Sequence, residues 1–169
     1  MTTNYTSLPL PQGSAGATIA TSLAFTEGPA VDVNGDLYFS DILNNRIMRL
    51  TTTGELSVFR EVSNRTNGQT FDQQGRLYHC EGSEFGPGGG RRVTRTTLAS
   101  GEYEVLTESY DGARYNSPND ICVDGNGVIY FTDPCYGDRS TMEMQEEGVY
   151  RINQDGTVTR IIQQPDIDR

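Results

Sequence analysis

The segment EGPAVDVNGDLYFSD (residues 27–41) contains a polar residue, a short apolar run, an Asn-Gly turn and a second apolar run closed by an acid. The pattern recurs as NGQTFDQQGRLYHCE (67–81) and NDICVDGNGVIYFTD (119–133). In each copy an oxygen-bearing side chain stands eight residues before the turn glycine, and these side chains are Glu27, Asn67 and Asn119. A repeat of this length predicts stacked or radially arranged units, in which equivalent positions converge on one axis.

Each copy opens a predicted unit of four antiparallel strands. Turn signals such as Asn34-Gly35 favour the positive φ of a β-hairpin, and a third strand carries an arginine at a matching place in every unit. The predicted strands are 30–33, 36–40, 46–50 and 55–59; then 69–72, 76–80, 92–96 and 102–106; then 121–124, 128–132, 149–153 and 157–162. Such units are the blades of a β-propeller, so the sequence predicts an all-β propeller with blades near 25–60, 66–107 and 117–162.

The domain organisation follows from the count of units. Residues 1–16 contain Pro9 and Pro11 without a clear period and predict a flexible lead-in, whereas 17–169 form a partial propeller domain. Residues 17–20 resemble a strand without a blade of its own. Propellers have about 4–8 blades, so three do not close a ring. We therefore expect the N-terminal half of a longer protein, or half of a ring that a second copy completes.

Composition excludes several classes of partner. The chain has 169 residues and a formal charge of −10, which argues against a nucleic-acid partner because phosphates attract a basic surface. It has no apolar run long enough to cross a bilayer and no visible secretory signal, so we expect no membrane partner and a cytoplasmic location. Three cysteines without C-x-x-C spacing favour neither a disulfide framework nor a structural zinc site.

Four motifs in order resemble one known family. They are FTEGP (25–29), the Asn67-Gly68 segment with GRL (75–77), CE (80–81) and RRV (91–93), SPND (117–120), and YFTDP (130–134). This combination resembles the gluconolactonase / senescence-marker-protein / regucalcin-like family, and most of all its bacterial gluconolactonase branch. The resemblance covers roughly residues 17–169 and implies the N-terminal half of a six-bladed propeller.

The resemblance also implies an activity and a site. Family members hold one divalent metal on the central axis and hydrolyse sugar-acid lactones, and relatives open other lactones or cleave organophosphates. It implies that Glu27 is a metal carboxylate, that Asn119 supplies an amide oxygen to the metal and contacts the substrate, and that Asn67 faces the substrate or a bound water. A further Asn and an Asp, the usual general base, are expected beyond Arg169.

The types of donor atom predict the metal and the mechanism. Carboxylate and amide oxygens are hard ligands, so we expect calcium first, with magnesium, manganese or zinc as alternatives. The metal would polarise the lactone carbonyl while a carboxylate activates water. Asp120 is the nearest carboxylate in the sequence, but it follows Asn119 in a strand and is expected to face the other way.

Other interpretations remain open for each residue. Glu27-Gly28-Pro29 fits an ordinary turn, Asn67 a turn residue, and Asn119 a loop cap. His79 is favoured as an ordinary strand residue over a catalytic base. Three closing acids are expected to make hydrogen bonds between units: Asp41, Glu81 and Asp133. The alternative functions are a related propeller phosphotriesterase and a non-catalytic propeller that binds calcium or a partner, because a fold alone does not give a function.

Overall fold

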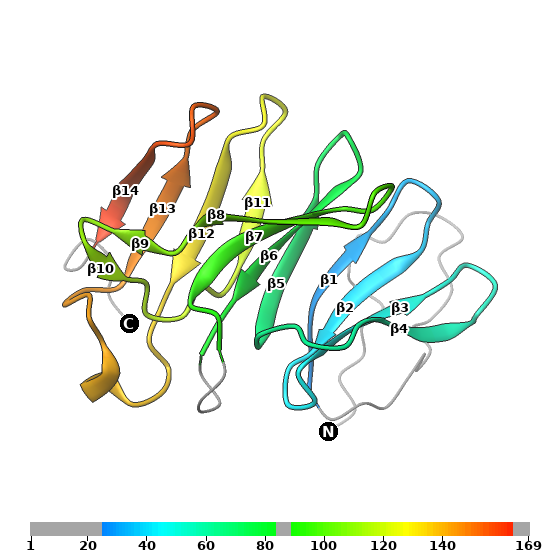
Figure 1. Cartoon of the computed structure of the whole chain (residues 1–169), viewed down its shortest axis with the longest axis horizontal. Helices are drawn as coiled ribbons and strands as arrows, with labels where there is room; N and C mark the ends of the chain where they lie inside the picture. Colours follow the sequence, from blue (N-terminus) through cyan, green and yellow to red (C-terminus); the bar gives the residue numbers. More distant parts are fainter. Residues whose placement is uncertain (1–24, 84–88, 164–169) are drawn as a thin grey trace, which may run out of the picture.

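The computed structural model of the protein describes residues 25–83 and 89–163. The predicted lead-in and the strand expected at 17–20 lie outside these ranges. Within them the chain forms three four-stranded antiparallel sheets and one two-stranded sheet, without an α-helix. No helix of the described part is therefore long and apolar enough to cross a membrane. Figure 1 shows the three large sheets side by side in chain order, blue and cyan, then green, then yellow to red.

Each large sheet corresponds to one repeat of the sequence, and its strands follow one another in chain order. Unit 1 consists of β1 (Thr26–Val31), β2 (Leu37–Asp41), β3 (Arg46–Leu50) and β4 (Leu56–Arg60). Unit 2 consists of β5 (Thr66–Phe71), β6 (Arg76–Glu81), β7 (Arg92–Thr97) and β8 (Glu102–Thr107). Unit 3 consists of β11 (Ile121–Val123), β12 (Ile129–Asp133), β13 (Gly148–Ile152) and β14 (Val158–Gln163).

Two smaller elements lie outside the large sheets. The hairpin of β9 (Ser109–Tyr110) and β10 (Ala113–Arg114) precedes unit 3, and a 3₁₀ turn at Arg139–Thr141 interrupts the connection between β12 and β13. The first strands of the units are neighbours, since β1 contacts β5 and β5 contacts β11. Propeller blades have this arrangement around their axis. The predicted fold class, all-β with repeated four-stranded blades, is confirmed.

The same local device forms the first hairpin of every unit. In unit 1, Asp32 Oδ1 accepts the backbone N–H groups of Asn34 and Asp36, at 2.8 and 3.0 Å. Asp72 and Asp124 do the same in units 2 and 3. The glycine that follows has a positive φ each time, +87° at Gly35. These Asx turns explain why the hairpins could be predicted from short-range sequence signals.

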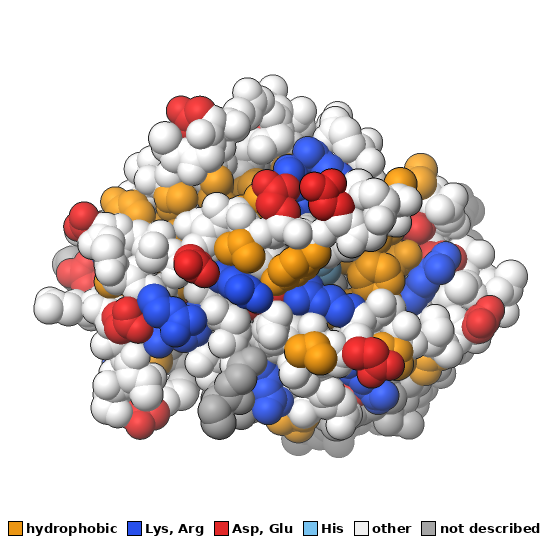
Figure 2. All heavy atoms as spheres, in the orientation of Figure 1, with side chains coloured by type: hydrophobic (Ala, Val, Ile, Leu, Met, Phe, Trp, Pro, Cys, Tyr) orange, Lys and Arg blue, Asp and Glu red, His pale blue; other side chains and the backbone are white. Residues whose placement is uncertain are grey.

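Aromatic side chains fill the space between neighbouring units. Tyr38 of unit 1 packs edge-on against Phe59 and against Phe71 of unit 2, with ring centroids 5.0 and 5.4 Å apart. A larger core joins units 2 and 3, where Tyr78 belongs to the same buried cluster as Phe131 and Tyr150. On the face shown in Figure 2, arginine, acidic and apolar side chains alternate rather than gathering by kind. Burial of these rings stabilises the contacts between the units.

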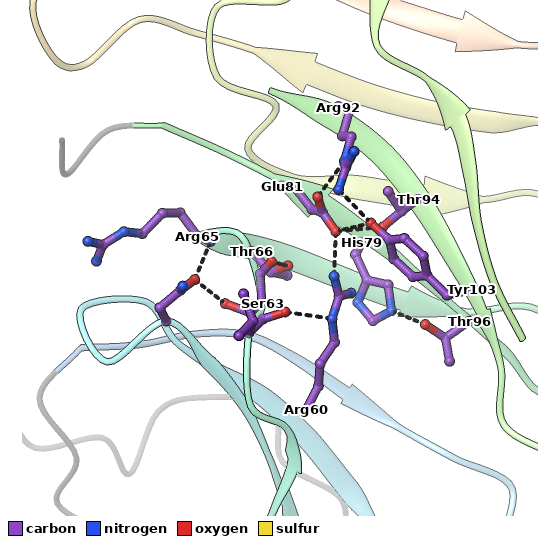
Figure 3. Close-up of polar contacts among 12 residues, drawn as sticks. Arg60, Ser63, Arg65, Thr66, His79, Glu81, Arg92, Thr94, Thr96 and Tyr103 are labelled. Carbon is purple, nitrogen blue, oxygen red and sulfur yellow. Dashed lines mark hydrogen bonds and ion pairs between the residues drawn. The ribbon is translucent and has the colours of Figure 1, made fainter. Parts of the chain in front are cut away.

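A buried carboxylate adds a polar link between units 1 and 2. Glu81 is fully buried and accepts hydrogen bonds from Arg60 at 2.8 Å, Arg92 at 2.7 Å and Tyr103 at 2.7 Å. Arg60 ends β4 of unit 1 and its guanidinium also lies over the Tyr103 ring, 4.5 Å from the centroid. Figure 3 shows both arginines pointing at the Glu81 carboxylate. The contact with Arg60 is the bond between units that the sequence predicted for this closing acid.

The other two closing acids behave differently. Asp41 bonds Arg46 and Asn44 of its own unit, and Asp133 bonds the backbone of the segment that enters unit 3. For these two, the contacts that the structure shows lie within a unit or its entry segment. The prediction of a bond between units was wrong in that respect, because Asp41 finds its donors at Asn44 and at the start of β3, and Asp133 finds its donors in the segment before β11.

Replacing Arg60 by alanine should destabilise the protein by about 2–3 kcal/mol, because one donor to a buried carboxylate is lost. Urea unfolding of the full-length protein measures this effect. Arg139→Ala is the matched control, since Arg139 pairs with Glu147 but its side chain is 44% exposed, against 18% for Arg60. The control should cost less than about 1 kcal/mol. Equal losses would show that the Arg60 link does not hold the units together.

Candidate metal and substrate site

The three repeated polar residues occupy equivalent places at the first strands. Glu27 lies in β1 opposite Ser40 of β2, and Asn67 lies in β5. Asn119 immediately precedes β11, and its N–H donates to the Thr132 carbonyl at 2.9 Å, which extends the pairing by one step. The sequence predicted all three just ahead of a strand. Glu27 and Asn67 instead lie inside their strands, where the pairing is irregular: the register shifts between Glu27 and Ala30 in unit 1 and between Thr66 and Gln69 in unit 2.

The backbone brings these places into direct contact. The Gly68 N–H donates to the Asn119 carbonyl at 2.6 Å. A β-carbon at Gly68 would come within 2.5 Å of that same oxygen, and one at Gly28, where φ is +54°, would overlap the Asn67 carbonyl. The same contact therefore occurs at both junctions between units: the glycine after the polar residue packs against the carbonyl of the polar residue in the next unit. The peptides at 27–28, 67–68 and 119–120 form one continuous row, which we call the axial row.

The donor set of the axial row suits a hard cation. Glu27 is exposed, and Asn67 and Asn119 are partly buried. One carboxylate and two amides offer oxygen donors of the kind that calcium and magnesium accept. Across 25–83 and 89–163, no three His, Cys, Asp or Glu side chains gather in a way that could hold a metal ion. A cation in the described part would therefore depend on amide oxygens as well as Glu27.

Asp120 is a second carboxylate of the axial row that the sequence did not assign to it. Its Oδ1 accepts the N–H of Ile121 at 2.9 Å. The same oxygen lies 2.7 Å from the place where a β-carbon on Gly68 would stand. The side chain is thus directed toward unit 2 and remains exposed. Gly68 has no side chain, and this leaves room for the Asp120 carboxylate. The glycine at this position is the feature of the sequence that could have indicated it.

The segment that leads to Asn119 is held by Asp133. The two carboxylate oxygens accept the N–H groups of Asn116 at 2.8 Å and Ser117 at 2.7 Å, and all three residues are buried. Burial raises the pKa of Asp133 to about 7, although the two N–H donors favour its charged form. Because it is enclosed, Asp133 acts on the loop before Asn119 and has no access to a solvent-borne substrate.

His79 is fully buried, and its ring makes two hydrogen bonds: Nδ1 lies 3.2 Å from Gln69 Oε1, and Nε2 lies 3.0 Å from Thr96 Oγ1. Figure 3 shows the contact with Thr96. Burial, followed by the nearby Arg60 charge, lowers the pKa of His79 from 6.5 to about 3. The ring is therefore neutral at ordinary pH. These contacts agree with the interpretation of His79 as a strand residue. Because the side chain is buried, it does not contact solvent.

The neutral ring predicts a specific dependence of stability on pH. The unfolded chain takes up a proton on His79 near pH 6.5, whereas the folded protein does so only near pH 3. The stabilisation is complete above pH 6.5 and is lost as the pH falls through this window. Between pH 6.5 and 5 the wild-type protein should lose about 1.5–2 kcal/mol more than His79→Gln, measured by urea unfolding. Parallel curves for the two proteins would contradict this assignment.

Comparison with known proteins identifies relatives of the chain. The model of the SMP-30/Gluconolactonase/LRE-like region matches residues 25–168. A gluconolactonase of Zymomonas mobilis is 30% identical over 162 residues, which cover 85% of this chain and 44% of that protein. The solved structure of a gluconolactonase from Xanthomonas campestris is 34% identical with a TM-score of 0.71, over 82% of this chain and 47% of that one.

A more distant structure shares the fold alone. Regucalcin from Agrobacterium tumefaciens, a calcium-binding protein, is 16% identical with a TM-score of 0.61, over 88% of this chain and 46% of that one. The chain thus spans about half the length of the relatives that it matches. Since the family model covers most of the sequence, the chain belongs to the SMP-30/gluconolactonase/LRE-like family.

Proposed function

We propose that the protein hydrolyses a sugar-acid lactone and that the axial row provides part of its site. The proposal is supported by the repeated backbone contact, Gly28 against Asn67 and Gly68 against Asn119, which joins the peptides at 27–28, 67–68 and 119–120 in one row. The names of two relatives, both gluconolactonases, support a lactone as the substrate. In this proposal Glu27 and Asn119 hold one divalent ion, calcium first, and Asn67 and Asn119 face the substrate.

In this proposal, the residues of this chain bind the divalent ion and orient the substrate. The Glu27 carboxylate supplies the negative charge and Asn119 an amide oxygen, which together suit a calcium site that leaves positions for water and substrate. When bound, the ion supplies a Lewis acid for the lactone carbonyl. The Asn67 amide can donate to one substrate oxygen and accept from a hydroxyl. The proposal assigns the general base to an Asp outside the present sequence, as the resemblance implies.

Removal of metal tests the proposal directly. Hydrolysis of glucono-δ-lactone by the full-length protein, followed by proton release in a pH-stat, should fall to the uncatalysed rate after treatment with a chelator. Calcium should restore it, and magnesium, manganese and zinc are compared in parallel. Hydrolysis that continues after chelation would refute the proposed dependence on a divalent ion. Hydrolysis of a phosphotriester without hydrolysis of the lactone would favour the phosphotriesterase alternative. Calcium binding without either reaction would favour the non-catalytic alternative.

A further inference from the structure

Unit 2 differs from its neighbours at three buried positions. The registers align Gln69, His79 and Thr96 of unit 2 with Ile121, Phe131 and Ile152 of unit 3. The equivalents in unit 1 are Pro29, Phe39 and Leu50, which are also apolar. The exposed fractions of the three polar side chains are only 5%, 0% and 7%. Burying polar groups where apolar ones fit costs free energy, so the exchange calls for a physical reason.

The three side chains form one hydrogen-bonded chain that reaches into unit 1. Gln69 Nε2 lies 3.3 Å from the Gly28 carbonyl and 3.1 Å from Ser40 Oγ, and Ser40 Oγ lies 2.8 Å from the Asn67 carbonyl. With the two bonds of His79, the chain runs from β7 through β6 and β5 to β2 and β1. Ser40 is also fully buried. No water is needed to connect its members.

The direction of every proton in this chain follows from its two ends. Backbone carbonyls only accept, so Ser40 must donate to Asn67 and the Gln69 amino group must face Gly28. Gln69 Oε1 then faces His79, so the ring carries its proton on Nδ1. Nε2 is left to accept from Thr96. Each donor and acceptor along the chain is thereby satisfied in a single arrangement, which is the condition under which a buried polar network fixes geometry.

The chain ends at the peptides of the axial row. Gly28 and Asn67, whose carbonyls accept the last hydrogen bonds, belong to the closely packed peptides at the first junction between units. Ser40 is also the strand partner of Glu27. Apolar side chains at these positions would pack the two units against each other, but they would not fix the relative orientation of the Gly28 and Asn67 peptides. The polar chain specifies it by hydrogen bonds to both.

We propose that Thr96, His79, Gln69 and Ser40 form a positioning chain that fixes the peptides of Glu27 and Asn67 relative to each other and so orients Glu27 for cation binding. The inference rests on the proposed function, since it assigns a purpose to that same site. None of the four residues touches the cation or the substrate in this account. They act through the Gly28 carbonyl and the Asn67 carbonyl, as outer partners do when they orient metal ligands.

The test replaces the three hydrogen-bonded side chains of unit 2 with the apolar residues that stand at the equivalent positions of unit 3. The triple variant Gln69→Ile, His79→Phe, Thr96→Ile gives unit 2 the apolar set of unit 3. In the full-length protein, calcium binding measured by calorimetry should weaken about tenfold while cooperative unfolding is retained. Ser40→Ala, which deletes one hydroxyl, should weaken binding in the same direction. Thr94→Val is the control, because this buried hydroxyl in β7 bonds Glu81 and lies outside the chain.

The outcomes separate this inference from the proposed function. Unchanged calcium affinity in Ser40→Ala, and in the triple variant where it folds, would overturn the positioning role even if Glu27→Gln weakens binding. Unchanged affinity in Glu27→Gln would instead overturn the proposed site itself. Nitrogen NMR of His79 gives an independent check: the ring should carry its proton on Nδ1 and stay neutral from pH 5 to 8. A proton on Nε2 would break the deduced order.

Discussion

Glu27→Gln in the full-length protein should weaken calcium binding by about 100-fold or more, a larger loss than mutation of an outer partner causes. The substitution keeps the shape of the side chain and one oxygen donor, but it removes the negative charge. Calcium affinity in proteins depends on the number of charged ligands, so this single charge has a large effect. At calcium concentrations that saturate the wild-type protein, lactone hydrolysis should fall with occupancy. Calorimetric titration and initial rates at several calcium concentrations measure both.

The control for this experiment is Glu55→Gln. Glu55 is an exposed carboxylate near the turn between β3 and β4, so the variant makes the same change in net charge away from the axial row. Its calcium affinity and hydrolysis should equal those of the wild-type protein. If Glu27→Gln also matches the wild type in both measurements, Glu27 is not a metal ligand and the axial site is wrong.

Gly28→Ala should destabilise the protein by about 4 kcal/mol. The backbone at Gly28 has a φ of +54°, a region that residues with a β-carbon adopt at a cost. The added carbon would also overlap the Asn67 carbonyl and stand 2.9 Å from the Gly68 α-carbon. Both neighbours are backbone atoms of unit 2, so the strain cannot be relieved by a side-chain rotation. Forcing the junction open adds about 1–3 kcal/mol to the conformational cost.

Gly75→Ala separates these two causes. Gly75 has a φ of +73°, and a β-carbon there would have no atom within 4 Å. This control should cost only about 1–2 kcal/mol, the penalty for the positive φ. Urea unfolding of both variants gives the difference. Equal destabilisation would mean that units 1 and 2 do not pack as closely at the axial row as the structure has them.

The strands were predictable because their signals are local. Each first hairpin is closed by an aspartate that bonds two following N–H groups and by a glycine at positive φ, and both residues can be seen in the sequence. The axial row was predictable for a different reason. Equivalent positions of a repeat converge, so three polar residues in register with the turn glycine had to approach one another once the units packed in order.

Contacts between units were harder to predict. The bond from Arg60 to Glu81 joins residues of different sheets, and no spacing in the sequence indicates which arginine reaches the buried acid. The role of Asp133 depends on backbone N–H groups, which every residue except proline has. The polar chain through His79 did leave a signal. Aligning the repeats shows Gln69, His79 and Thr96 where the other two units have apolar residues, but only the structure shows that these positions are buried together.

The most direct test of the axial site is the position of the metal itself. Crystals of the full-length protein grown with calcium give an anomalous difference map at long X-ray wavelength. We expect a peak about 2.3–2.6 Å from a Glu27 carboxylate oxygen and from the Asn119 amide oxygen. A calcium peak bound by other residues, with Glu27 directed into solvent, would contradict the account.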